Sequence, residues 1–127
     1  MHGEGHRPAW AEIDLEALQA NVRAFRAAAA PATLCAVVKA DAYGHGAVAV
    51  SRAAVAAGAT CLAVATVAEG AELRAAGIDA SIMVLSEPRP EDAAEVVALG
   101  LVPVVYTETG IDALARAAGP DIGRAHV

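Results

Sequence analysis

The stretch Leu34-Cys35-Ala36-Val37-Val38-Lys39 decides the fold, because an apolar run ends abruptly in a lysine. The run from Thr33 to Val38 does not alternate between polar and apolar residues, which predicts a buried strand. The chain then continues as ADAYGHG over residues 40–46, a polar link with a tyrosine and two glycines. A lysine at the end of a buried strand either reaches out to solvent or is kept poorly solvated for chemistry.

The same arrangement of helix, glycine and apolar run repeats along the rest of the chain. Four glycines follow alanine- or leucine-rich stretches and suit the left-handed position that closes a helix: Gly58, Gly77, Gly100 and Gly119. Each is followed by an apolar run that predicts a strand: Cys61 to Ala65, Ile82 to Leu85, Val102 to Tyr106, and one that begins near Ala125.

Several residues mark where the helices begin. Asp14 suits an N-cap, and the helix after it is expected to end before Pro31. Thr66 to Glu69 has the spacing of a capping box, and Thr109 to Asp112 resembles it. Pro90 fits a first helical turn. Together with the apolar runs, these marks predict strand and helix in alternation, four times over.

This alternation predicts an α/β fold. Strands that are apolar along their whole length indicate a parallel sheet with right-handed crossovers, both of whose faces are covered. Two architectures are compatible with it, an open doubly wound sheet and part of a (β/α)8 barrel. We expect residues 1–8 to be a loose tail and residues 9–127 to be one domain, with a short strand over Ala9 to Asp14.

The length favours a partial structure. A closed barrel needs about 250 residues, whereas the chain has 127, and its last residues, Asp121 to Val127, resemble the approach to another strand. We therefore expect an N-terminal fragment: the first half of a (β/α)8 barrel.

Composition excludes several classes of function. The net charge is −6 and only 3% of residues are aromatic, so we expect no nucleic-acid surface. No apolar stretch reaches the roughly 18 residues of a membrane span, and Met1 to Arg7 has no signal-peptide core. We expect a cytoplasmic protein in which Cys35 and Cys61 are buried free thiols. The scattered histidines lack metal-ligand spacing, so we expect no metal site.

Lys39 is the candidate catalytic residue. Active sites on parallel sheets gather at the carboxyl ends of the strands, and burial favours the neutral amine that can form a Schiff base. By position alone, a lysine that extends to solvent remains the commoner case. In the loop, Tyr43 could donate to a phosphate or pack its ring, while His45 is expected to be a spacer and Asp41 to bond locally.

A second motif competes with this interpretation. Residues 44–49 read GHGAVA and fit G-x-G-x-x-A, the dinucleotide fingerprint. The fit is poor, because the first glycine of that fingerprint follows the strand closely, whereas here the five residues from Lys39 to Tyr43 lie between the strand and Gly44. The second strand is also followed by Thr66 rather than by an acid that would bind a ribose.

Four segments together resemble the alanine racemases. AVVKADAYGHG (36–46) looks like the cofactor-lysine segment of that family, and PAWAEIDLEAL (8–18) resembles its opening. LAVATVAEGAELRAAGI (62–78) and SIMVLSEPRPED (81–92) match its pattern in the same order. The resemblance implies a (β/α)8 barrel followed by a β-rich domain, with pyridoxal 5′-phosphate bound as an aldimine to Lys39.

The same resemblance implies an activity and a set of site residues. The reaction would interconvert L- and D-alanine and supply D-alanine for peptidoglycan, in a homodimer. Lys39 would handle the proton of the D-enantiomer, Tyr43 would contact the cofactor phosphate, and Val37 and Leu85 would line the cofactor pocket. The family's opposite-face tyrosine and its arginine at the pyridine nitrogen lie further along, so the 127 residues alone are expected to be inactive.

Two other classes of function remain open. One is a different pyridoxal-phosphate barrel, such as a cofactor carrier or an amino-acid decarboxylase, since those also have a lysine at the end of the first barrel strand. The other is a non-enzymatic α/β module that binds a phosphate in the glycine loop.

Overall fold

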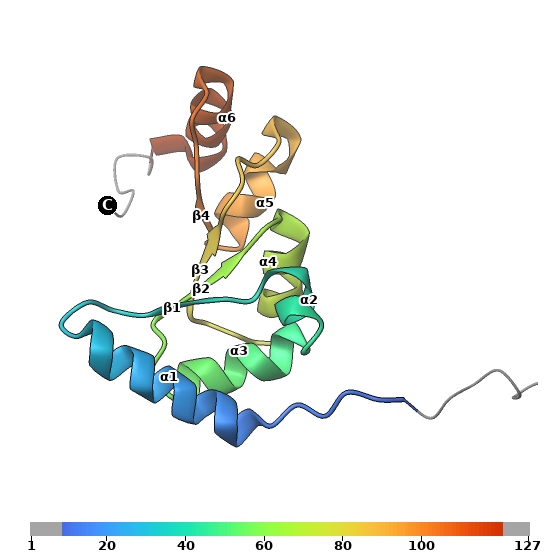
Figure 1. Cartoon of the computed structure of the whole chain (residues 1–127). Coiled ribbons are helices and arrows are strands. Elements are labelled where there is room, and N and C mark those ends of the chain that lie inside the picture. Colours follow the sequence, from blue (N-terminus) through green and yellow to red (C-terminus); the bar gives the residue numbers. More distant parts are fainter. Residues whose placement is uncertain (1–8, 121–127) are drawn as a thin grey trace, which may run out of the picture.

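The computed structural model describes residues 9–120. Its centre is a parallel sheet with strands in the order β1-β2-β3-β4, which is also their order in the sequence. The strands are β1 (Cys35–Val37), β2 (Cys61–Val64), β3 (Ser81–Val84) and β4 (Val102–Pro103). Figure 1 shows the four strands stacked through the middle of the molecule, each followed by a helix.

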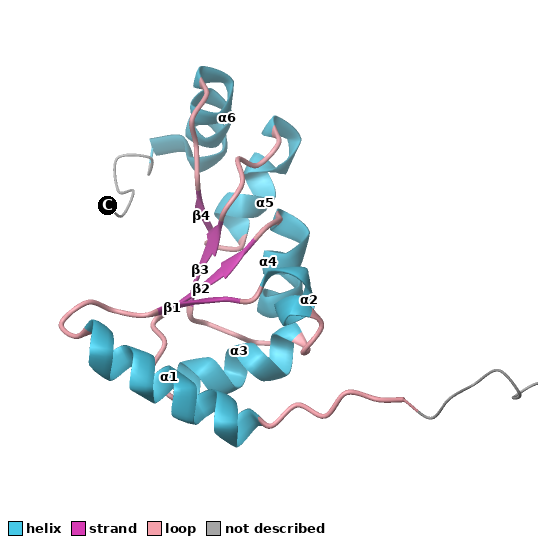
Figure 2. Cartoon of the chain, viewed as in Figure 1, coloured by secondary structure: helices cyan, strands magenta, loops and turns pink. Residues whose placement is uncertain are grey.

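The helices gather on one side of this sheet (Figure 2). They are α1 (Leu15–Ala29), α2 (Lys39–Tyr43), α3 (Ala47–Ala56), α4 (Val67–Ala75), α5 (Ala93–Ala98) and α6 (Glu108–Ala118), with a 3-10 turn, η2, at Pro90–Asp92. A doubly wound sheet reverses its strand order and has helices on both faces. Sequential strands with helices on one face are instead the arrangement of consecutive units of a (β/α)8 barrel, as the second of the two predicted architectures requires.

The core lies between the sheet and these helices. The largest fully buried side chains there include Leu62, Ile82 and Val84 from the strands, with Leu73 from α4 and Val96 from α5. Dispersion and the hydrophobic effect therefore hold α4 and α5 against the strands.

The opposite face of the sheet is open among the described residues, and the prediction that both faces are covered is wrong for them. In β3 the burial alternates, with Ile82 and Val84 buried but Ser81 exposed and Met83 half-buried. Val37 in β1 is 42% exposed. All helices pack on one face because consecutive right-handed crossovers return the chain to the same side each time.

Three further predictions need correction. Ala9 to Asp14 forms no strand, since none of the strands formed by residues 9–120 lies beside it to pair with its backbone groups. The fourth strand is only Val102–Pro103, because proline has no N–H to donate to the ladder. The N-cap of α6 is Thr107, whose Oγ1 accepts from Gly110 N at 3.0 Å, and not a residue of the Thr109 to Asp112 segment.

The two cysteines also differ from expectation. Both are free thiols, as predicted, but Cys35 is exposed and Cys61 is half-buried. They are paired in register across β1 and β2, and they project on the open face with Val37. An apolar sequence run predicts a strand well, but it does not tell which of its residues face the helices.

The helix ends agree well with the sequence. Asp14 accepts a hydrogen bond from Ala17 N at 3.0 Å, α1 ends at Ala29, and Thr66 and Glu69 form a complete capping box. Pro90 begins η2. The four predicted helix-closing glycines all have positive φ, between 61° and 118°. The predicted tail (1–8), the approach from Asp121 and the strand near Ala125 lie outside the described residues.

Candidate functional site

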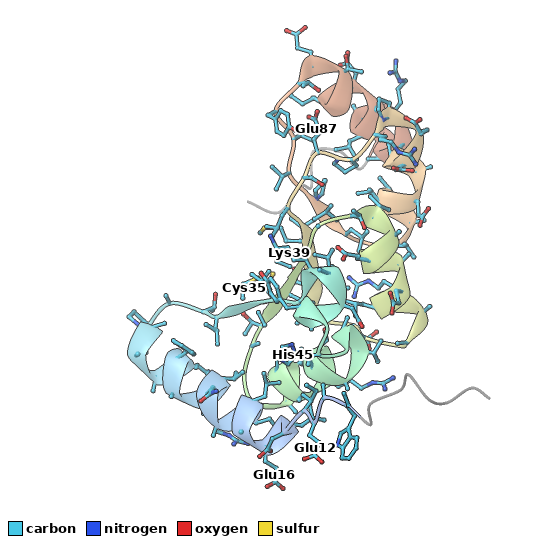
Figure 3. All side chains as sticks on the ribbon, turned by 45° about the vertical axis from the view of Figure 1, so that its right-hand side comes forward. Glu12, Glu16, Cys35, Lys39, His45 and Glu87 are labelled. Atoms are coloured by element: carbon cyan, nitrogen blue, oxygen red, sulfur yellow. The ribbon has the colours of Figure 1, made fainter. Side chains whose placement is uncertain are left out.

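Lys39 lies where β1 ends, at the carboxyl end of the sheet (Figure 3). Val38, just before it, is 1% exposed, and its N–H donates to Ala63 C=O at 2.8 Å, so the sheet pairing continues to the residue before the lysine. The Lys39 side chain is half-buried. It is also the only lysine in the chain.

The residues after Lys39 form a left-handed turn. Ala40, Asp41, Ala42 and Tyr43 have φ values between 52° and 57°. For non-glycine residues this conformation costs about 1–2 kcal/mol each, so it persists only where surrounding contacts hold it. The turn at the end of β1 must therefore be stabilised by specific partners.

Some of these partners belong to the loop itself. The N–H of Ala42 donates to Val38 C=O at 2.9 Å, and the N–H of Gly46 donates to Asp41 C=O at 2.9 Å. Asp41 Oδ1 accepts from Ala47 N at 2.8 Å and so caps α3, which is the local bond expected of it. His45 Nδ1 lies 2.9 Å from Ala42 C=O and must be the donor there, as a hydrogen-bonded spacer.

Glu69 provides the contact from outside the loop. Its Oε2 accepts from Ala40 N at 2.6 Å, while its Oε1 accepts from Ala65 N at 2.7 Å and Thr66 N at 3.1 Å. One carboxylate thus joins the backbone after β1 to the backbone after β2. The capping-box pattern in the sequence identified Glu69 as a helix-start residue, but it gave no sign of the bond to Ala40.

The other predicted site residues lie at the same end of the sheet. Val37 is on β1 and Leu85 directly follows β3, and each is 42% exposed. Val37 is in register with Met83, so Leu85 lies two strand spacings across the sheet and two residues further along it, about 12 Å away. Tyr43, at the end of the left-handed turn, is 61% exposed. These residues offer an apolar surface, an amine and a phenol at the open mouth of the sheet.

A second carboxylate, Glu87, joins the next pair of strands. It accepts from Tyr106 N at 2.7 Å, Thr107 N at 2.9 Å and Thr107 Oγ1 at 2.9 Å. These bonds, led by the one from Tyr106, hold the pKa of the Glu87 carboxyl below its usual range. Figure 3 shows Glu87 well away from Lys39, so its role is to hold β3 and β4 together at this edge.

A crevice beside this carboxylate is a less suitable site. It has a volume of about 460 Å³ and is lined by Thr66, Val67, Ala68, Val84, Ser86, Glu87, Pro88, Arg89, Asp92 and Glu95. Its one cation, Arg89, already pairs with Asp92 at 2.9 Å. Neither Lys39 nor another predicted site residue lines it, so we place the candidate site at Lys39.

The structure also weakens the dinucleotide interpretation of residues 44–49. In that motif the phosphates bind the free N–H groups at the start of the helix. Here α3 begins at Ala47, whose N–H already donates to Asp41. Within residues 9–120, no group of three or more His, Cys, Asp or Glu side chains is arranged to hold a metal ion.

Comparison with known families identifies the family of the chain. The family model described as "Alanine racemase, N-terminal domain" matches residues 13–127. The chain belongs to this alanine racemase family. An alanine racemase of Symbiobacterium thermophilum is 51% identical over 101 residues, covering 80% of this chain and 27% of that protein. One of Desulfovibrio desulfuricans is 45% identical over 113 residues, covering 88% and 30%.

Solved structures of alanine racemases have the same fold. The enzyme of Bacillus anthracis with bound L-Ala-P superposes with a TM-score of 0.81 at 36% identity, over 88% of this chain and 29% of that one. The enzyme of Streptomyces lavendulae superposes with a TM-score of 0.80 at 44% identity, over 89% and 30%. The chain therefore spans less than a third of the length of these alanine racemases.

Proposed function

We propose that the protein carrying this chain is an alanine racemase that holds pyridoxal 5′-phosphate covalently through Lys39 Nζ. One observation carries the proposal: the sole lysine of the chain follows β1 at the carboxyl end of the sheet, inside the segment that resembles the family's cofactor site. The names of the relatives support the substrate, and the Bacillus anthracis structure contains L-Ala-P.

The residues at this edge fit such a cofactor. Lys39 is half-buried, which removes part of the solvent around its amine while leaving it reachable. Val37 and Leu85 are exposed apolar side chains on the open side of the sheet, suited to packing against an aromatic ring. Tyr43 is an exposed residue whose hydroxyl can donate to a phosphate.

The chemistry needs a proton carrier on each face of the substrate. The cofactor, when bound, supplies an electron sink for the charge left at Cα. Lys39 Nζ, freed when the amine of the substrate takes its place, would take and return the proton of the D-enantiomer on one face. We assign the proton carrier of the other face to a partner subunit of a homodimer, outside residues 9–120.

The remaining parts of the proposal follow from the family. Residues 9–127 would form the first units of a (β/α)8 barrel, and residues 1–8 a tail before it. The enzyme would act in the cytoplasm and provide D-alanine for peptidoglycan. None of the helices formed by residues 9–120 has both the length and the apolar character to cross a bilayer.

Borohydride reduction and a racemisation assay together test the proposal. We expect reduction of the holoprotein to attach the cofactor to the peptide that contains Lys39, which mass spectrometry would detect. Lys39→Arg keeps the charge but cannot form the covalent bond. This variant should not be labelled, and its rate of L-alanine racemisation should fall at least 1,000-fold. Labelling without racemisation would favour a cofactor carrier or a decarboxylase. Full activity in Lys39→Arg would exclude the role of this lysine.

A further inference from the structure

We infer that Glu69 is a positioning residue for Lys39, which rests on the proposed role of that lysine. Glu69 lies 30 residues further along the chain and on another unit of the fold, yet its Oε2 accepts from Ala40 N at 2.6 Å. The peptide unit that carries this N–H begins at the carbonyl of Lys39. The bond therefore fixes the backbone at which the lysine side chain is attached.

Backbone strain makes this contact necessary. Ala40 is the first of four consecutive left-handed residues, and nothing in its own side chain favours that conformation. Its N–H points out of the loop and bonds to Glu69, whereas the bonds within the loop are donated by Ala42 and later residues. Without the carboxylate, Ala40 N loses its partner, and the bond from Ala42 N to Val38 C=O is left to restrain the end of the turn nearest the lysine.

The other oxygen of Glu69 anchors the carboxylate to the backbone that follows β2. Its Oε1 accepts from Ala65 N and Thr66 N, directly after β2. The bond from Thr66 N belongs to the capping box at the start of α4. Lys39 is thus positioned relative to the neighbouring strand, and not only by its own strand.

Glutamine at position 69 separates this positioning from helix capping. A glutamine side chain can keep one oxygen on Ala65 N and Thr66 N, and glutamine is accepted in a capping box. Its amide –NH2 would then face Ala40 N, which is also a donor, so the bond to the Lys39 turn is lost. Glu69→Gln should therefore fold, with α4 capped and the turn released.

Two matched control variants are available in the chain. Glu87→Gln alters a carboxylate with three donors at the same edge, remote from the turn, and Thr107 Oγ1 can reverse its role and accept from the new amide. Thr66→Ala removes the hydroxyl that accepts from Glu69 N at 3.2 Å but leaves the bond to Ala40 in place. Neither control touches the Lys39 turn.

The experiment compares these variants in the protein that carries the chain. In the holoprotein, we expect Glu69→Gln to lower kcat by about 10- to 100-fold with little change in KM, and both controls to stay within about two-fold of the unchanged protein. In the cofactor-stripped protein, hydrogen exchange measured by mass spectrometry should become faster over residues 39–43 in Glu69→Gln alone.

Each other outcome has a definite meaning. Unchanged exchange over residues 39–43, a loss of kcat that Thr66→Ala reproduces, or failure of Glu69→Gln alone to fold would overturn the inference. Faster exchange with an unchanged kcat would mean that the bond from Ala40 N to Glu69 stabilises the turn but does not position Lys39 for catalysis. That outcome would also overturn the inference. If the unchanged protein does not racemise alanine, the proposed function fails instead, and the exchange data still decide whether Glu69 holds the turn.

Discussion

Cys35 and Cys61 lie directly opposite each other in adjacent parallel strands, on the open face of the sheet. Partial burial, a hydrogen bond with Cys61 and the electrostatic interaction with Cys61 together raise the pKa of the Cys35 thiol to about 12, and burial contributes most. The Cys35 thiol therefore stays protonated, and poorly nucleophilic, throughout the physiological range.

We expect Cys35 to react slowly with iodoacetamide at pH 8, although it is exposed. Cys61→Ala removes the neighbouring thiol and should increase the alkylation rate of Cys35 several-fold, because part of the rise in its pKa disappears. Mass spectrometry of the alkylated peptide would measure both rates. Equal rates in the two proteins would contradict the role of Cys61.

The same pKa predicts a loss of stability at high pH. A thiol whose pKa is raised on folding, from 9.0 to about 12, contributes its full stability below about pH 9. Above that, the unfolded chain ionises first, so the contribution is lost as the pH rises from 9 to 12. Urea unfolding at several pH values would test this, with Cys35→Ser as the control whose stability falls less over that range.

Ala40→Gly should stabilise the protein by about 1 kcal/mol. Ala40 has φ 52° and an exposed side chain, so glycine removes the left-handed strain without leaving a cavity. The gain is partly offset by the greater freedom of glycine in the unfolded chain. Thermal unfolding would measure it, and Ala24→Gly, exposed within α1, should instead destabilise by a similar amount.

Ser51→Ala should stabilise the protein by about 1–2 kcal/mol. Ser51 is fully buried in α3, and its Oγ has no hydrogen-bond partner among residues 9–120. A buried hydroxyl without a partner costs free energy that a methyl group does not. Denaturant unfolding measures the change. A loss of stability in Ser51→Ala would mean that the hydroxyl has a partner outside those residues.

Arg74→Met should destabilise the protein by about 2–4 kcal/mol. The guanidinium donates to four backbone carbonyls in the segments that lead into β3 and β4, those of Ile78, Ala80, Leu99 and Gly100, at 2.7–3.2 Å. Removing it leaves these acceptors without their charged donor. Arg74→Lys should recover only part of the loss, because an ammonium cannot match the guanidinium fork. Chemical denaturation of both variants would measure the difference.

Local signals in the sequence were sufficient for most of the helix ends. Asp14, Thr66 and Pro90 begin helices as predicted, and the glycines that follow the helices have the positive φ expected of them. These helix ends depend only on residues a few positions away in the sequence, so the local sequence is sufficient to predict them. The predicted roles of Tyr43, Val37 and Leu85 at a cofactor remain predictions.

Longer-range features could not be read in this way. The segment from Ala9 has a strand-like pattern but no partner strand among the described residues, and an apolar run such as Ser81–Val84 turns one side to the helices and the other to the open face. Pairing and burial depend on which segments meet in space, and the pattern of a single segment does not contain that information.

The sequence by itself determined that a lysine ends the first strand, and the motif around it identified the family. Only the tertiary structure decided how that lysine is held. Four consecutive left-handed residues follow it, and a carboxylate from the next unit, Glu69, bonds to the first of them. The physical reason is that strained backbone has no signature of its own in residue types, because it is stabilised by partners that only folding brings near.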